Sequence, residues 1–194
     1  METREKVYSI LVVSATETFN AALRTVLPEF MYSPVVFEGS VNAARRTVSD
    51  REFDLVIVNS PLTDDSGIRF AVDLCESKNT VVLLVVRTEL YSSTRIKTSP
   101  HGVFVMSKPV SRTTVMMALD WMTATRERLR LLEKRTVSIE EKMQEIRAVN
   151  RAKWLLINQH GMSEPAAHRY IEKQAMDGCV SKKEIADTII KTYS

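Results

Sequence analysis

The sequence of 194 residues has only two cysteines and no long apolar run. Cys75 and Cys179 are far apart and have no C-x-x-C spacing, so we expect two reduced packing residues rather than a disulfide. The longest apolar run, Val81 to Val86, is far too short to cross a bilayer. The first ten residues contain no apolar stretch of signal-peptide length, so the chain is expected to be cytoplasmic.

The charge is nearly balanced overall but unevenly distributed. The hydrophobic share of 44% and the charged share of 26% are typical of a soluble globular protein. Residues 1–124 contain 13 Lys and Arg against 14 Asp and Glu, whereas residues 125–194 contain 14 against 10. The basic excess of the C-terminal third favours a polyanionic partner there, although a surplus of this size also serves solubility.

Five short apolar runs recur in the first 110 residues. They are rich in β-branched residues and nearly unbroken, like strands buried on both faces of a parallel sheet. Thr16 and Ser40 are suitable N-caps for helices ending near residues 27 and 49, and Gly67 precedes another periodic stretch. The pattern predicts an α/β fold with a doubly wound, five-stranded parallel sheet and a site at the carboxyl ends of its strands. The runs are residues 8–13, 34–37, 54–58, 81–86 and 103–106.

The strand ends resemble those of the receiver domain of bacterial response regulators, over about residues 6–124. A receiver has an acidic pair after its first strand, a phosphoacceptor Asp ending the third, Thr or Ser ending the fourth, and Lys-Pro after the fifth. Here only Lys108-Pro109 and Gly67 match. The first run is followed by Ser14 and Ala15, the third ends at Asn59, and the fourth continues through Val85 without a hydroxyl.

These departures remove the chemistry of a receiver. Aspartyl phosphorylation needs a carboxylate nucleophile and a Mg²⁺ held by neighbouring oxygens. Asn59 supplies no nucleophile, and Ser14 and Ala15 supply no anionic ligand. Asp64 and Asp65 of the following loop are interpreted as solvated acids rather than substitutes. The resemblance therefore implies a pseudo-receiver, in which the fold is kept for binding and coupling.

Lys108 has no catalytic counterpart without an aspartyl phosphate, so we expect a polar or structural role for it. The alternative is that Lys108 and Arg87 bind a small anion. We expect no metal and no cofactor, and the pseudo-receiver is expected to have a protein or small-ligand partner.

A long helix is predicted after the sheet, because no Gly or Pro occurs between Ser111 and Gln159. Apolar residues recur there at alternating spacings of three and four over about five heptads, from Val115 to Asn150, which is typical of a parallel dimeric coiled coil. The alternative is a single helix that folds back on the receiver-like half. The residues expected to make the dimer contact are Leu129, Leu132, Ile139, Met143, Ile146 and Asn150.

The last 50 residues predict a module of three helices. Gly161 is suited to a left-handed helix end, and Ser163 caps the next helix, which stops at Gly178. The segment from Ser181 to Glu184 forms a capping box that opens the last helix. The sequence RAKWLLINQHGMSEPAAHRYIEKQAMD, followed by KKEIADTII, closely resembles the ANTAR domain, the RNA-binding module of bacterial transcription antiterminators, over about residues 138–191.

The resemblance implies a homodimer that binds tandem RNA hairpins in a leader transcript, so that a terminator cannot form. Proteins bind such hairpins through cationic side chains that contact the phosphates and through stacking and hydrogen bonds to unpaired bases. Gln174 is equally suited to an interhelical hydrogen bond. The residues that we expect to bind RNA are Arg151, Lys153, His160, Arg169, Tyr170, Lys173, Gln174, Lys182 and Lys183.

Three regions are therefore expected: a receiver-like domain over residues 1–124, a coiled-coil helix over 111–150 and an RNA-binding module over 138–194. A DNA-binding factor, or a protein that sequesters a partner through the pseudo-receiver, are the alternatives. No nucleophile–base pair or phosphate-binding loop is recognisable, so we do not expect an enzyme.

Overall fold

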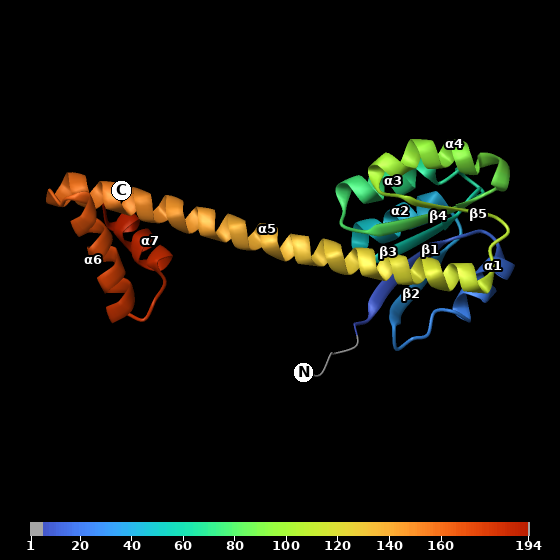
Figure 1. The fold of residues 1–194 in the computed structure, drawn as a ribbon, viewed down its shortest axis with the longest axis horizontal. Helices are drawn as coiled ribbons and strands as arrows, with labels where there is room; N and C mark the ends of the chain where they lie inside the picture. Colours follow the sequence, from blue (N-terminus) through green and yellow to red (C-terminus); the bar gives the residue numbers. More distant parts are fainter. Residues whose placement is uncertain (1–5, 194) are drawn as a thin grey trace. The chain divides into compact units, whose positions relative to one another are not determined.

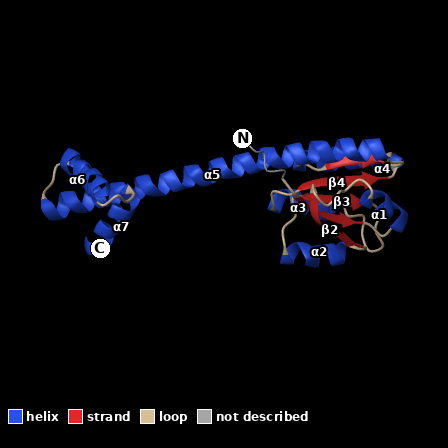
Figure 2. Ribbon diagram, turned by 90° about the horizontal axis from the view of Figure 1, so that it is seen from below, coloured by secondary structure: helices blue, strands red, loops and turns tan. Residues whose placement is uncertain are grey.

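The computed structural model describes residues 6–193, which form two compact units divided after Leu131. The first unit contains the strands and the helices between them, and the second contains helices only (Figures 1 and 2). The predicted fold class, an α/β domain followed by a long helix and further helices, is confirmed.

The first unit is built on five strands that pair in parallel throughout. They are β1 (Tyr8–Val13), β2 (Tyr32–Glu38), β3 (Leu55–Asn59), β4 (Val81–Val86) and β5 (Phe104–Ser107). Their order in the sheet is β2-β1-β3-β4-β5. Val13 pairs with Val58 and Asn59 with Val85, so the carboxyl ends of the three central strands meet at one edge.

Helices cover both faces of this sheet. They are α1 (Glu17–Arg24), α2 (Val41–Asp50), α3 (Ile68–Ser77), α4 (Thr88–Thr98) and the first part of α5 (Arg112–His160). Because side chains alternate along a strand, Leu11 and Val13 lie in the core covered by α2 and α3. Ile10 and Val12 lie in the core covered by α1 and α5.

The doubly wound pattern implies a helix between the fourth and fifth runs, but no cap or apolar periodicity marked α4 itself in the sequence, and its packing explains why. Its buried side chains are Thr94 and Thr98, 3% and 0% exposed, whereas Leu90 and Ile96 are 48% and 70% exposed. With threonines facing inward and large apolar residues facing outward, the helix lacks the apolar stripe by which amphipathic helices are recognised.

Helix α5 is a single helix of 49 residues, as its lack of Gly and Pro predicts. The first positions of the predicted coiled-coil seam are, however, used within the first unit. Ala118 and Met122 are buried in the core under the sheet, and Val115 and Leu129 pack partly against it. Leu129, expected to contact a second chain, is therefore covered at least partly by its own, because α5 must shield one face of the sheet.

The second unit packs the end of α5 against α6 (Glu164–Asp177) and α7 (Lys182–Tyr193). Gly161 has a φ of 64°, and the Ser163 hydroxyl accepts a hydrogen bond from the N–H of Ala166. Ser181 and Glu184 exchange two hydrogen bonds, 2.9 and 3.2 Å long, as the capping box predicts. The buried residues of this unit are Val149, Ala152, Leu155, Leu156, Ala167, Ile171, Ala175, Ala186 and Ile189.

The two cysteines differ in environment. Cys75 is partly buried in the first core, and burial raises the pKa of its thiol to about 11, which suits an unreactive packing residue. Cys179 is exposed and has a φ of 49° in the turn after α6, so it is not the packing residue that we expected. No helix within residues 6–193 is long and apolar enough to span a membrane.

Candidate functional site

Asn59 lies at the carboxyl end of β3 and is only 2% exposed. Its Nδ2 donates a hydrogen bond of 3.0 Å to Oγ of Ser14, the residue after β1, and its Oδ1 has no hydrogen-bond partner among the described residues. Asn20 of α1 approaches the same serine, since its Nδ2 donates to the Ser14 carbonyl at 3.4 Å. Where a receiver has carboxylates, this chain thus has a buried group of neutral polar side chains.

Lys108 follows β5, and its Nζ donates a hydrogen bond of 2.7 Å to the main-chain carbonyl of Ser60. Burial, and then the charge of Arg87, lower the pKa of Lys108. Val85 is buried within the sheet, and Ala15 is exposed. Lys108 therefore ties the end of β5 to the residue that follows Asn59.

An open pocket of about 220 Å³ lies beside these residues. We call it the strand-end pocket. It brings together two residues that the sequence analysis selected, Asn59 and Lys108, whereas Ser14, Ala15 and Val85 do not line it. Its lining residues are Thr16, Phe19, Asn59, Lys108, Pro109 and Val110.

The acidic residues after β3 support the loop in which they lie. Asp64 accepts hydrogen bonds from the N–H groups of Val41 and Asn42, at 3.0 and 2.9 Å, and these bonds lower its pKa. Asp65 accepts one from the N–H of Gly67, at 2.6 Å. Both are exposed, as expected, but Asp64 also binds the N-terminus of α2, which the interpretation as a merely solvated acid missed.

This arrangement offers hydrogen bonds and a cation but no nucleophile at Asn59. Glu17 is the nearest acid in sequence after Ser14. Its carboxylate accepts hydrogen bonds from Arg24 at 2.7 Å and from Asn20 at 3.5 Å, and both lower its pKa. Within residues 6–193, no three His, Cys, Asp or Glu side chains are grouped so as to hold a metal.

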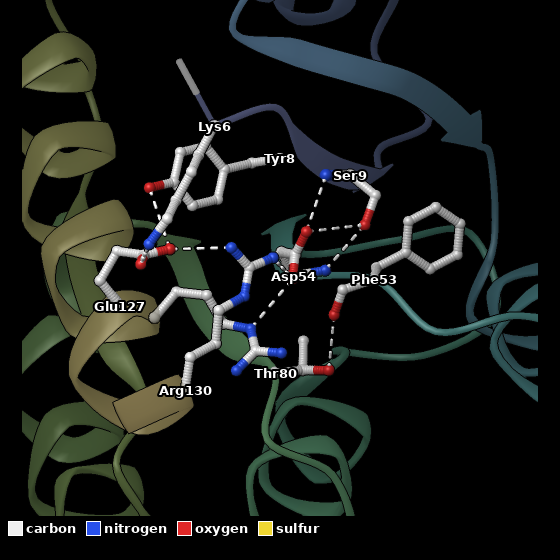
Figure 3. Close-up of polar contacts among 9 residues, drawn as sticks. Lys6, Tyr8, Ser9, Phe53, Asp54, Thr80, Glu127 and Arg130 are labelled. Carbon is white, nitrogen blue, oxygen red and sulfur yellow. Dashed lines mark hydrogen bonds and ion pairs between the residues drawn. The ribbon is translucent and has the colours of Figure 1, made fainter. Parts of the chain in front are cut away.

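A polar cluster at the amino-terminal edge of the sheet joins β1 and β3 to α5 (Figure 3). Asp54 directly precedes β3 and accepts hydrogen bonds from the N–H and hydroxyl of Ser9, at 3.0 and 3.2 Å. Arg126 and Arg130 of α5 also donate to it, at 3.0 and 2.7 Å. Burial raises the pKa of Asp54, but the bonds from Ser9 and the two arginines outweigh it and leave the pKa below the usual value.

Glu127 extends the Asp54 cluster. It accepts hydrogen bonds from Tyr8, at 3.2 Å, and from Arg130, at 2.8 Å, and it pairs with Lys6 (Figure 3). The cluster holds α5 to the sheet as far as Arg130, one residue before the division between the units. Sequence reasoning missed it, because no pattern relates residue 54 to a pair of arginines more than 70 residues away.

In the second unit, α6 presents four of the predicted RNA-binding residues on one exposed face. The buried residues of α6 recur every four positions, at 167, 171 and 175, so the positions between them face outward. We call this surface the α6 outer face. It consists of Arg169, Tyr170, Lys173 and Gln174, all exposed.

The other predicted RNA-binding residues are mostly engaged within the unit. Lys182, for example, donates a hydrogen bond to the carboxylate of Glu172, and this bond lowers the pKa of Glu172. The His160 ring stacks edge-on against Tyr193 at 5.0 Å between ring centroids, so it packs against α7. Arg151 is exposed on α5. The three lysines have these partners: Lys153 with Glu164 (3.0 Å), Lys182 with Glu172 (2.5 Å) and Lys183 with Gln144 (3.1 Å).

Beyond the first unit, α5 has an exposed apolar stripe, which we call the α5 seam. Its large residues are about half exposed, and Trp154, which the sequence analysis did not select, is 63% exposed nearer the end of the helix. Such a stripe on a helix is suited to pairing with another helix. The α5 seam consists of Leu132, Ile139, Met143, Ile146 and Asn150.

Comparison with known proteins agrees with the division of the chain into two units. Residues 138–190 match the ANTAR domain family, which confirms the resemblance noted in the sequence. The first unit has the fold of response-regulator receivers. A signal receiver domain of an HD domain-containing protein from Pseudomonas fluorescens Pf-5 is 22% identical, with a TM-score of 0.57 over 67% of this chain and 95% of that one. A receiver domain protein from Clostridium thermocellum is 18% identical, with a TM-score of 0.55 over 65% and 99%.

The chain thus joins a receiver-like fold to a region that matches the ANTAR domain family. Over 183 residues it is 22% identical to the transcriptional regulatory protein PdtaR of Mycobacterium tuberculosis, in strains H37Rv and CDC 1551. That similarity covers 94% of this chain and 89% of PdtaR, so it extends across both units.

Proposed function

We propose that this protein regulates transcription by binding RNA through its ANTAR domain and preventing terminator formation. The observation that carries the proposal is the match of residues 138–190 to the ANTAR family, together with the α6 outer face that lies within it. The similarity to a transcriptional regulatory protein along almost the whole chain supports the regulatory part.

The α6 outer face has the chemistry that an RNA loop requires. Arg169 and Lys173 are one helical turn apart and can neutralise phosphates, and Tyr170 is 40% exposed beside them and can stack on an unpaired base. Gln174 supplies both a donor and an acceptor for a base edge. Lys153 and Lys182 would first have to exchange Glu164 and Glu172 for phosphates, so we rank them behind the two α6 cations.

We also propose that the protein dimerises and that its receiver-like domain does not respond to phosphodonors. The α5 seam would pair two chains, so that each dimer carries two ANTAR domains for two hairpins. The receiver-like domain would not be switched by aspartyl phosphorylation, because the carboxamide of Asn59 cannot act as the nucleophile. Input would then come from a ligand or a partner protein rather than from a phosphodonor.

RNA binding is tested by titrating the full chain with a synthetic RNA of two tandem stem-loops and with duplex DNA of equal length. We expect preference for the RNA and a steep loss of affinity with salt. Arg169→Ala and Lys173→Ala should each reduce the slope of log K against log salt by about 0.7–0.9. Lys97→Ala, an exposed cation of α4 in the other unit, is the matched control and should leave the slope unchanged.

Equal affinity for duplex DNA would instead favour the DNA-binding alternative. Absence of binding to either nucleic acid would favour a protein that sequesters a partner through its receiver-like domain.

A further inference from the structure

The strand-end pocket contains polar groups that the proposed RNA binding does not use. The Oδ1 of Asn59 has no hydrogen-bond partner among the described residues, although Asn59 is only 2% exposed and lines the pocket. Nearly all buried polar atoms in proteins are hydrogen-bonded, and an exception calls for a missing partner. Because this atom is covered by its neighbours, a ligand with an N–H or O–H group would supply that partner after displacing part of the cover.

The same pocket contains a cation, the ammonium group of Lys108. The Lys108 ammonium group has three N–H donors, and one of them is directed to the Ser60 carbonyl. Arg87 lies close enough to affect the ionisation of Lys108, so its positive charge adds to the local potential. An anionic group is therefore the natural ligand for this side of the pocket.

The remaining lining is largely apolar, and the space is small. Phe19, Pro109 and Val110 supply the apolar surface, and the volume is about 220 Å³. Pockets for drug-sized ligands have about 300–1,000 Å³, so this one suits a molecule of fewer atoms. Pro109 and Val110 also stand directly before α5, so a bound molecule would touch the segment that leads into the long helix.

We propose that the strand-end pocket binds a small organic carboxylate with a hydroxyl or amino group on the carbon next to the carboxylate. The carboxylate accepts hydrogen bonds from Lys108, the neighbouring hydroxyl or amine donates to Oδ1 of Asn59, and the alkyl part lies against Phe19. An inorganic anion without an O–H group, such as sulfate, fits less well, because it would place only acceptor oxygens against the acceptor oxygen of Asn59. This binding is independent of whether the ANTAR domain binds RNA.

The test uses L-lactate, L-alanine and propionate with the full chain in isothermal titration calorimetry. L-lactate and propionate differ only by the hydroxyl group, so L-lactate should bind about tenfold more tightly if that hydroxyl pairs with Asn59. Lys108→Met should abolish binding of all three, and Lys97→Met, an exposed lysine of α4, should leave it unchanged. Asn59→Leu should remove the difference between L-lactate and propionate.

Asn59→Asp keeps the shape of the side chain and places a negative charge in the pocket, so it should lose the carboxylates even if Asn59→Leu folds poorly. Inorganic sulfate is the probe for a simple anion site, and tighter binding of sulfate than of L-lactate would overturn the proposal. Absence of binding up to about 20 mM for all three carboxylates, or equal binding of L-lactate and propionate, would also overturn it.

Discussion

At the scale of single residues, the receiver-like domain has Asn59, Ser14 and Ala15 at the positions where a receiver has carboxylates. The Asn59 carboxamide is buried and donates to Ser14, so the end of β3 is stabilised by a hydrogen bond between neutral groups. Ser14 and Ala15 offer no carboxylate to a metal ion. Restoring aspartyl phosphorylation would therefore need several substitutions at once, because these positions supply neither the carboxylate nucleophile nor the ligands for a metal ion.

This gives a first prediction. Acetyl phosphate or beryllofluoride with Mg²⁺ should change neither the mass nor the oligomeric state of the protein, as measured by intact mass spectrometry and light scattering. The Asn59→Asp variant should not be phosphorylated either, because Ser14 and Ala15 cannot hold the metal ion. A stable phosphoryl adduct on the wild-type chain would contradict this account of the pocket.

Asp54 gives a second prediction at this scale. Asp54→Asn removes the charge that faces Arg126 and Arg130 while it keeps the shape of the side chain. Hydrogen bonds to charged groups contribute about 1.5–3 kcal/mol, so the free energy of unfolding of the first unit should fall by about 2 kcal/mol. Urea denaturation followed by circular dichroism measures the change. Asp73→Asn, which breaks an exposed ion pair with Arg45, is the control and should cost less than about 1 kcal/mol.

The pH dependence has a definite sign. The pKa of Asp54 is lower in the folded state than in the unfolded state, so its contribution is fully present above the unfolded value of about 3.9. It is lost as the pH falls from there through the lower folded value. The difference in stability between wild type and Asp54→Asn should therefore shrink below about pH 4. A constant difference from pH 7 to 3 would contradict the assignment.

At the scale of elements, the sequence was informative where one local rule decides the structure. Buried β-branched runs predict the strands, the absence of Gly and Pro predicts α5, and hydroxyl caps with Gly161 predict the ends of the helices in the second unit. Helix α4 carried no such local signal, because its inward side chains are Thr94 and Thr98. Periodicity shows where an apolar stripe runs but not what covers it, and so the positions at Ala118 and Met122 were assigned to a second chain.

The candidate site was predictable in part for the same reason. Positions at strand ends follow from the topology of a parallel sheet, so the sequence alone places Asn59 and Lys108 at one edge. The cluster around Asp54 and the partners of the lysines in the second unit depend on tertiary packing instead. No short motif marks these contacts, because their residues are distant in the sequence and meet only when the helices pack.

The α5 seam gives a third prediction, that Ile139→Glu yields monomers. Burying an unpaired carboxylate between two helices costs several kcal/mol, whereas Ile139 is 58% exposed in the single chain and tolerates a charge there. Light scattering at tens of micromolar should show a dimer for wild type and a monomer for the variant, with unchanged circular dichroism.

Ser138→Glu is the matched control, because it places the same charge on the neighbouring exposed position away from the seam. It should remain dimeric. A monomeric wild type would show that the α5 seam has another partner.

At the scale of the whole molecule, each chain has one modest surface that we propose binds RNA. Dimerisation through the α5 seam would bring two such surfaces together. The α6 outer face alone supplies two cations and one exposed aromatic ring, which is a small site. Two such sites that engage one RNA gain about 10² to 10⁴ in affinity through effective concentration, provided that the geometry allows both to bind. If the proposal is correct, dimerisation is a requirement for tight binding.

The central claim, a dimer that binds two hairpins at once, is tested most directly by comparing tandem and single stem-loop RNA with wild type, Ile139→Glu and Ser138→Glu. Wild type and Ser138→Glu should prefer the tandem RNA by about 10²-fold or more, and Ile139→Glu should bind both RNAs equally and weakly. Equal affinity of wild type for single and tandem stem-loops, or a preference that survives in monomeric Ile139→Glu, would contradict the account.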